Sequence, residues 1–317
     1  MNTCLTAIKV SSQSNSLIIQ HDILKTLLYF DIFNYPLHLE EIVNYSHFSS
    51  DEIQEELLNL SSNHLVYKIN NFYSLEKEDS FVLKRVEENS RAKKMIKKAS
   101  LFSRFISQFP FVRGVFISGS LSKGSFEKGD DIDYFIVTSP NRLWLARTIL
   151  IFYKKVFLLN SKKYFCINYL MSTNALEIAE KNRFTATEFV TLIPMFGDSV
   201  YQDLQEKNTW ILKYFPNYNI KNTPKVLKNT WLKQFLEFLF QGKLGARLDE
   251  KFMKITKKHQ YKKFEELKNN DFEVAFKGDK NTSKHHPNNY QTKVVEALNN
   301  KIKKFNKKYS LEIPLES

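Results

Sequence analysis

The segment from residue 119 to residue 137, GSLSKGSFEKGDDIDYFIV, contains the residues best suited to chemistry in this sequence. Asp131 and Asp133 stand at the head of an apolar run that predicts a strand, so their side chains should share one face. Crowded carboxylates repel each other and resist desolvation, and the pair therefore requires a cation. Carboxylate oxygens favour a hard divalent ion, most naturally Mg²⁺ accompanied by the phosphates of a substrate.

Gly119 and Ser120 precede the aspartates and supply the complementary half of the expected site. Glycine lets a ligand approach the backbone closely, and the amide and hydroxyl donors of the following turn can hold a phosphate. Lys123, in the same loop, is expected to bind the substrate with them. A simpler alternative is that Asp131 and Asp133 only cap a turn before the strand.

A Gly-Ser turn after one strand, followed by Asp-x-Asp entering the next, resembles the polymerase-beta-like nucleotidyltransferase superfamily over residues 110 to 175. The resemblance implies that Mg²⁺ or Mn²⁺ bridges Asp131 and Asp133 to a nucleoside triphosphate held by Gly119 and Ser120. It also implies that an acceptor hydroxyl attacks the α-phosphate while pyrophosphate leaves. Asp130 stands where relatives often have serine, and we interpret it as an outward neighbour that adds negative potential.

One departure from the superfamily pattern concerns the third carboxylate, which usually comes from a later strand. The strand predicted from KKYFCINYLMS has no acidic residue, and Asn168 lies where that group is expected. An amide can coordinate a metal but cannot accept a proton. Either Glu177 or Glu188 reaches in from the following helical region, or the site works with two acids, or it binds a nucleotide without turnover. The last alternative describes a regulatory or antitoxin-like module.

The periodicity of apolar residues predicts an α+β chain in three parts. Residues 16–78 resemble a winged helix-turn-helix domain, with helices near Ser16, Pro36 and Ser49 and a hairpin turning at Asn70. Residues 80–175 should form a small mixed-sheet nucleotidyltransferase core with an initial long basic helix. Residues 176–317 should form a helical C-terminal region, with a polar loop in which FEVAF could be a short strand.

The third helix of the N-terminal part would carry the base contacts if this domain read DNA. It contains Asp51, Glu52, Glu55 and Glu56, whose charges oppose a polyanion. We therefore expect no sequence-specific DNA binding. A packing or dimerisation role is favoured, and an oligomer could form through this domain.

The composition sets limits on partners and location. The net charge of +13 over 317 residues permits nucleic acid or acidic phosphate ligands, although a generic basic surface explains it as well. Cys4 and Cys166 are too few for a disulfide framework or zinc module, and the adjacent His285 and His286 are expected in a loop. No signal peptide or membrane-spanning run is evident, which predicts a cytoplasmic protein without a membrane partner.

Overall fold

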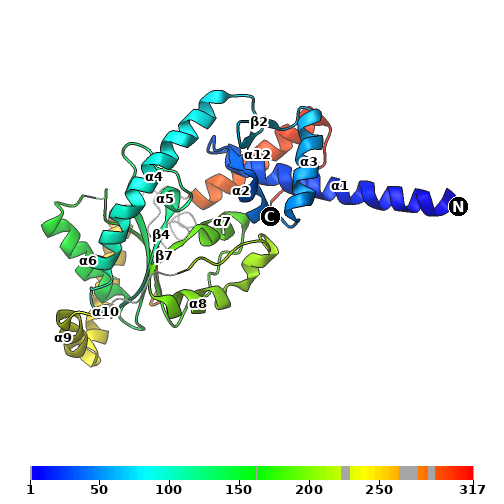
Figure 1. The fold of residues 1–317 in the computed structure, drawn as a ribbon. Coiled ribbons are helices and arrows are strands. Elements are labelled where there is room, and N and C mark those ends of the chain that lie inside the picture. The colour runs from blue at the N-terminus through cyan, green and yellow to red at the C-terminus, as the bar shows by residue number, and fades with distance from the viewer. Residues whose placement is uncertain (1, 162, 223–228, 264–277, 285–289, 317) are drawn as a thin grey trace.

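The structure of the chain is a computed structural model, which describes residues 2–161, 163–222, 229–263, 278–284 and 290–316 (Figure 1). It is an α+β fold built around a three-stranded sheet near the N-terminus and a five-stranded sheet in the centre. None of the described helices is both long enough and apolar enough to cross a bilayer.

The N-terminal part has the helices and hairpin that the sequence predicts, together with one additional strand. The helices are α1 (Asn2–Asp31), α2 (Leu39–Asn44) and α3 (Ser50–Ser62), and the strands are β1 (Leu37–His38), β2 (Tyr67–Ile69) and β3 (Phe72–Ser74). Asn70 has a φ of 54° at the hairpin turn, and Ser49 and Glu52 form the predicted capping box. The second helix does not begin at Pro36, because Leu37 and His38 pair with β3 in extended conformation.

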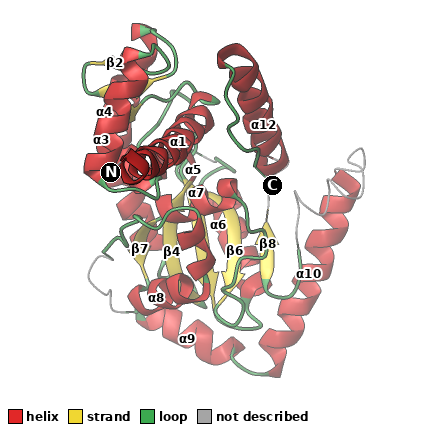
Figure 2. Ribbon diagram, turned by 90° about the vertical axis from the view of Figure 1, so that its right-hand side faces the viewer, coloured by secondary structure: helices red, strands yellow, loops and turns green. Residues whose placement is uncertain are grey.

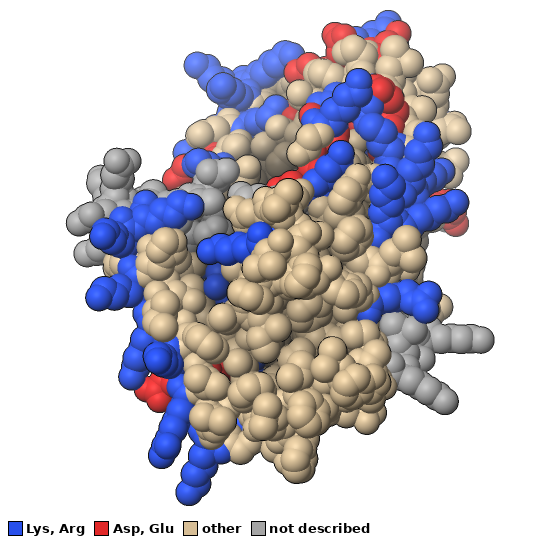
Figure 3. Space-filling model, turned by 90° about the vertical axis from the view of Figure 1, so that its left-hand side faces the viewer, with Lys and Arg blue, Asp and Glu red and all other residues tan. Residues whose placement is uncertain are grey.

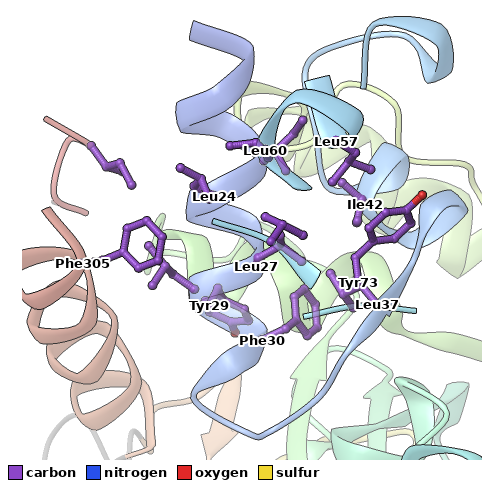
Figure 4. Packing of buried hydrophobic residues seen from close by; sticks show 14 of the residues in the cluster. Leu24, Leu27, Tyr29, Phe30, Leu37, Ile42, Leu57, Leu60, Tyr73 and Phe305 are labelled. Carbon is purple, nitrogen blue, oxygen red and sulfur yellow. The ribbon is translucent and has the colours of Figure 1, made fainter. Parts of the chain in front are cut away.

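The C-terminal helix α12 (Tyr290–Tyr309) packs against α1 rather than in a separate helical region. Figure 4 shows Phe305 of this helix facing the cluster of α1 side chains that includes Leu24, Leu27 and Tyr29. The same core contains Leu57 and Leu60 of α3. Residues from the two ends of the chain therefore form one hydrophobic core.

The five-stranded sheet has the order β7-β4-β5-β6-β8, with β5 and β6 parallel and the other pairs antiparallel. Its three central strands are those predicted from the sequence: β4 (Val112–Ser118), β5 (Asp133–Thr138) and β6 (Cys166–Ser172). The edge strands β7 (Ile193–Phe196) and β8 (Thr282–Lys284) come from the region after residue 175. The sheet is thus not contained within residues 80–175, and the C-terminal region is not purely helical.

Helices cover both faces of this sheet (Figure 2). Alternate residues of β4 and β5, such as Val115 and Ile136, pack against α4 (Asp79–Ile106) and α6 (Leu143–Phe157). The intervening residues, such as Phe116 and Phe135, pack against α7 (Arg183–Thr191) and α8 (Asp198–Lys207). The remaining helices among the described residues are the short α5 (Gly119–Ser122), the 3₁₀ helix Thr209–Lys213, α9 (Trp231–Phe240) and α10 (Lys243–Lys263). The FEVAF stretch, His285 and His286 lie outside the described residues.

Candidate active site

The turn after β4 lies directly against Asp133. Ser118, the last residue of β4, is the Cα partner of Asp133 at the start of β5. Gly119 follows with a φ of +71°, and a Cβ added to it would lie 2.6 Å from Asp133 Oδ2. Glycine is favoured here, because an L-residue would be strained in this backbone conformation and its Cβ would displace the Asp133 carboxylate. The Gly-Ser turn and the second aspartate are therefore neighbours in space as well as in sequence.

Asn168 contacts Asp133 because β6 has a bulge at this position. Cys166 and Ile167 pair with Asp133 and Tyr134, but the next pair joins Tyr169 to Phe135, so Asn168 is an extra residue. Its Nδ2 donates to Asp133 Oδ1 at 2.5 Å, and its Oδ1 accepts from the Cys166 thiol at 3.2 Å. Asn168 thus holds the carboxylate of Asp133 in a fixed orientation.

Glu188 of α7 brings a further carboxylate to the site. Its Oε1 lies 2.7 Å from Lys123 Nζ, and the same ammonium donates to the carbonyl oxygen of Gly119 at 3.1 Å. Glu177, the other acid considered for this role, is exposed and pairs with Lys181 instead. Of the two glutamates, only Glu188 lies among the residues that line the cavity beside Asp133.

The electrostatics of the site favour a bound cation. The pKa of Asp133 is raised to about 7, chiefly by burial and in smaller part by the negative charges of Asp131 and Glu188, against lowering effects from Cys166 and Lys123. Burial and the negative charges of Asp133 and Asp131 raise the pKa of the Cys166 thiol to about 12. Because Asp133 resists ionisation while it is unaccompanied, a positive ion beside it would be stabilising.

Asp130 does not point outward, contrary to the interpretation from the sequence. Its Oδ2 accepts hydrogen bonds from Ser120 Oγ at 3.2 Å and from the backbone N–H of Glu127 at 2.9 Å. It lines the same cavity as Ser120 and Asp133. Its physical role is to close the loop between the Gly-Ser turn and the aspartates, since it binds both ends of that loop.

The cavity next to these residues has a volume of about 650 Å³. One part is polar and contains Gly119, Ser120, Lys123, Asp133, Asn168 and Glu188. The other part is apolar and comes from α1, α7 and α12, with Phe30, Phe33, Phe184, Phe189 and Val294 among its lining residues. The sequence analysis missed this second part, because no local pattern brings residues from both ends of the chain to one cavity.

The donor set fits a hard divalent cation without forming a complete protein cage. Among the described residues, no group of three or more His, Cys, Asp or Glu side chains is arranged to hold a metal. Asp131 lies close enough to raise the pKa of Asp133, although it does not line the cavity. Mg²⁺ is commonly bound by one or two carboxylates, with water and substrate phosphates completing its shell. Asp133, which lines the cavity, and Asp131, which lies near it, supply the carboxylates that this requirement names.

Arg142, at the N-cap of α6, and Arg147, within α6, are not part of the site. Arg142 donates to the carbonyl oxygens of Phe240 and Gly242 at the end of α9, and Arg147 stacks over the ring of Trp144. Neither lines the cavity. What the site can do follows from its own residues, because no protein-family model, curated protein or solved structure matches this chain.

Proposed function

We propose that this protein is a metal-dependent nucleotidyltransferase that moves a nucleoside monophosphate from a nucleoside triphosphate to an acceptor hydroxyl. The observation that carries the proposal is the close approach of Gly119 to the Asp133 carboxylate, at a φ of +71° where a Cβ would lie 2.6 Å from Oδ2. Phosphates can come close to the backbone of the Gly119 turn, and the neighbouring Asp133 carboxylate can bind the metal ion that accompanies them. On this proposal, the five-stranded sheet is the nucleotidyltransferase core and the N-terminal part is a winged helix-turn-helix module.

Each residue of the site has a role in this reaction. Asp131 and Asp133 would hold Mg²⁺ or Mn²⁺, which when bound neutralises phosphate charge and makes the α-phosphate more electrophilic. Asn168 orients Asp133 by donating to Oδ1, which leaves Oδ2 toward the Gly119 turn. A triphosphate beside Gly119 would compete with Glu188 for the Lys123 ammonium.

Glu188 is the candidate general base. Asn168 cannot accept a proton, whereas the carboxylate of Glu188 lines the same cavity. In the structure Glu188 is paired with Lys123, and release of that pair by the incoming triphosphate would free the carboxylate for the acceptor hydroxyl. Binding of the nucleotide and activation of the acceptor are thereby coupled through one ion pair.

The same ion pair favours a second candidate function, a nucleotide-binding regulatory or antitoxin-like module with little turnover. If Lys123 keeps Glu188 when the nucleotide is bound, Glu188 is not available as a base, and the group beside Asp133 in the position of the third acid is the amide of Asn168. Such a site could bind a metal nucleotide and respond to it without transferring it. The two candidates differ only in turnover and not in binding.

Nucleotide titration and a transfer assay test both candidates. In calorimetry with Mg²⁺ and each nucleoside triphosphate, Asp131→Asn and Asp133→Asn should abolish binding while retaining the fold, because loss of a carboxylate also removes like-charge repulsion. Asp203→Asn, an exposed aspartate on α8, is the matched control and should bind like the native protein. Unchanged affinity in both site variants would contradict the proposal.

Turnover is then measured with α-labelled triphosphates, Mg²⁺ or Mn²⁺, and a cell extract as the source of acceptors. Transfer of label that requires Asp133 supports the transferase. Binding without any transfer supports the regulatory module.

A further inference from the structure

Helix α9 is inverted, with its charged residues inside and its apolar residues outside. Lys233 is 1% exposed, and its Nζ donates to the carbonyl oxygens of Ser107 at 2.7 Å and Val112 at 3.0 Å. Glu237 accepts from the backbone N–H of Phe111 at 2.6 Å and pairs with Arg113. These anchors hold the helix in one orientation against the end of α4 and the start of β4.

The outward side of α9 carries large apolar side chains. Five of them are at least half exposed: Trp231, Leu232, Phe235, Phe238 and Leu239. Side chains of this size are ordinarily buried, and a group of them at one surface marks a contact site. Because Lys233 and Glu237 are fixed by hydrogen bonds, a rotation that buried the apolar side would leave several backbone and side-chain groups unpaired.

The C-terminal end of α6 likewise has a charged residue inside and apolar residues outside. Lys154 is 9% exposed, whereas Phe152 and Phe157 on the same helix are 62% and 65% exposed. Leu159, just after the helix, is 89% exposed. Figure 3 views the side of the molecule on which α6 and α9 lie, and shows a broad face without charged residues bordered by rows of Lys and Arg. We refer to the exposed apolar residues of α6 and α9 and Leu159 as the apolar face.

Charge indicates which surface the apolar face fits. Lys and Arg border this face in Figure 3, α6 and α10 carry exposed lysines, including Lys155, Lys243, Lys251 and Lys258, and the whole chain has a net charge of +13. Two copies meeting through this face would bring their lysines together and repel each other. An anionic lipid surface takes up aromatic and aliphatic side chains at its acyl boundary and attracts the surrounding lysines.

We propose that the apolar face docks this protein on the surface of a membrane rich in anionic lipids. α9 inserts its aromatic side to the depth of the headgroups and upper acyl chains, and the lysines around it bind headgroup phosphates. The sequence led us to expect no membrane partner because it lacks a spanning segment, and peripheral docking requires none. The proposal does not depend on the activity of the cavity.

The first test is sedimentation of the full chain with vesicles. Vesicles with about 30 mol% phosphatidylglycerol in phosphatidylcholine should sediment the protein, and pure phosphatidylcholine should sediment much less. The double variant Phe235→Ser/Phe238→Ser should lower the partition coefficient at least about tenfold without changing the fold, since both side chains are exposed. The matched control is Leu58→Ser on α3, which removes a side chain that is 69% exposed outside the apolar face. It should sediment like the native protein.

Two further measurements distinguish lipid contact from other uses of the face. Brominated lipids should quench tryptophan fluorescence, and Trp231→Phe should remove that quenching, because Trp231 lies on the outward side of α9. Lys155→Glu/Lys243→Glu should weaken binding to anionic vesicles, as should added salt. Equal weak binding to both kinds of vesicle would overturn the proposal. So would a dimer in solution that Phe235→Ser/Phe238→Ser dissociates, since the face would then bind a second copy.

Discussion

Gly119→Ala is the most direct probe of the contact between the turn after β4 and Asp133. The new Cβ would lie 2.6 Å from Asp133 Oδ2, well inside van der Waals contact, at a φ of +71°. The left-handed conformation alone costs an L-residue about 1–2 kcal/mol. Asp133 must also move, which breaks its hydrogen bond from Asn168, and a bond to a charged group contributes about 1.5–3 kcal/mol.

Gly124→Ala is the matched control, because it carries the same backbone cost without the clash. Gly124 has a φ of +77°, and the nearest atom to an added Cβ is Asn89 Oδ1 at 3.6 Å, an ordinary contact. We expect Gly124→Ala to lower the free energy of unfolding by about 1–2 kcal/mol. Gly119→Ala should lower it by about 1.5–3 kcal/mol more, and it alone should displace Asp133.

Urea unfolding measures the two stabilities, and calorimetric titration with Mg²⁺-ATP measures the consequence for the site. Gly119→Ala should weaken nucleotide binding by about tenfold or more, equivalent to about 1.4 kcal/mol, whereas Gly124→Ala should bind like the native protein. Equal losses of stability in the two variants, together with native affinity in Gly119→Ala, would refute the reasoning.

Three other predictions concern the base, a buried lysine and DNA. Glu188→Gln should reduce nucleotidyl transfer by about 10²-fold or more while retaining nucleotide binding, because it removes the base. Glu177→Gln should change neither transfer nor binding. Asn168→Asp should bind metal no better than the native protein, because it crowds another acid beside Asp133. Burial lowers the pKa of Lys233 from 10.5 to about 8, so the folded state loses this proton before the unfolded chain does. The free energy of unfolding should therefore rise between pH 8 and 10.5 by up to about 3 kcal/mol relative to Lys233→Met, as followed by urea unfolding at each pH. Footprinting at physiological salt should show no sequence-specific duplex binding, since α3 is acidic, and low-salt binding should fall steeply as salt rises.

Short sequence patterns predicted the strands, the helix cap and the turn that depend on residues close together in the chain. The strands β4, β5 and β6 are apolar runs between polar turns, and all three form where the sequence indicates them. The capping box at Ser49 and the turn at Asn70 are likewise decided by residues a few positions apart. The proximity of Gly119 to Asp133 follows from the same logic, because a hairpin-like return brings the end of β4 to the start of β5.

The contacts that complete the candidate site depend on residues distant in sequence. The sequence placed Asn168 on the strand where a third acid is expected, but the bulge that turns its amide to Asp133 arises from the register between β5 and β6. Glu188 reaches Lys123 because α7 packs on one side of the sheet, and the sequence could not distinguish it from Glu177, another glutamate of the same region, by residue type alone. Asp130 was misread because its acceptor role toward Ser120 requires the folded loop.

Helix α9 shows most clearly what a hydrophobic pattern leaves open. The sequence predicts a helical region after residue 176, and the amphipathic pattern of α9 within it separates a charged side from an apolar side. The periodicity groups the apolar residues on one side of the helix, but it does not determine which side packs against the protein. The apolar side is ordinarily assigned to the interior, on the assumption that the same chain covers it. Here Ser107 and Val112 present carbonyl oxygens to Lys233, and Phe111 and Arg113 present donors to Glu237, so the charged side is the one that finds partners. The orientation of α9 is decided by these polar groups at the junction of α4 and β4, and the aromatic side is left exposed.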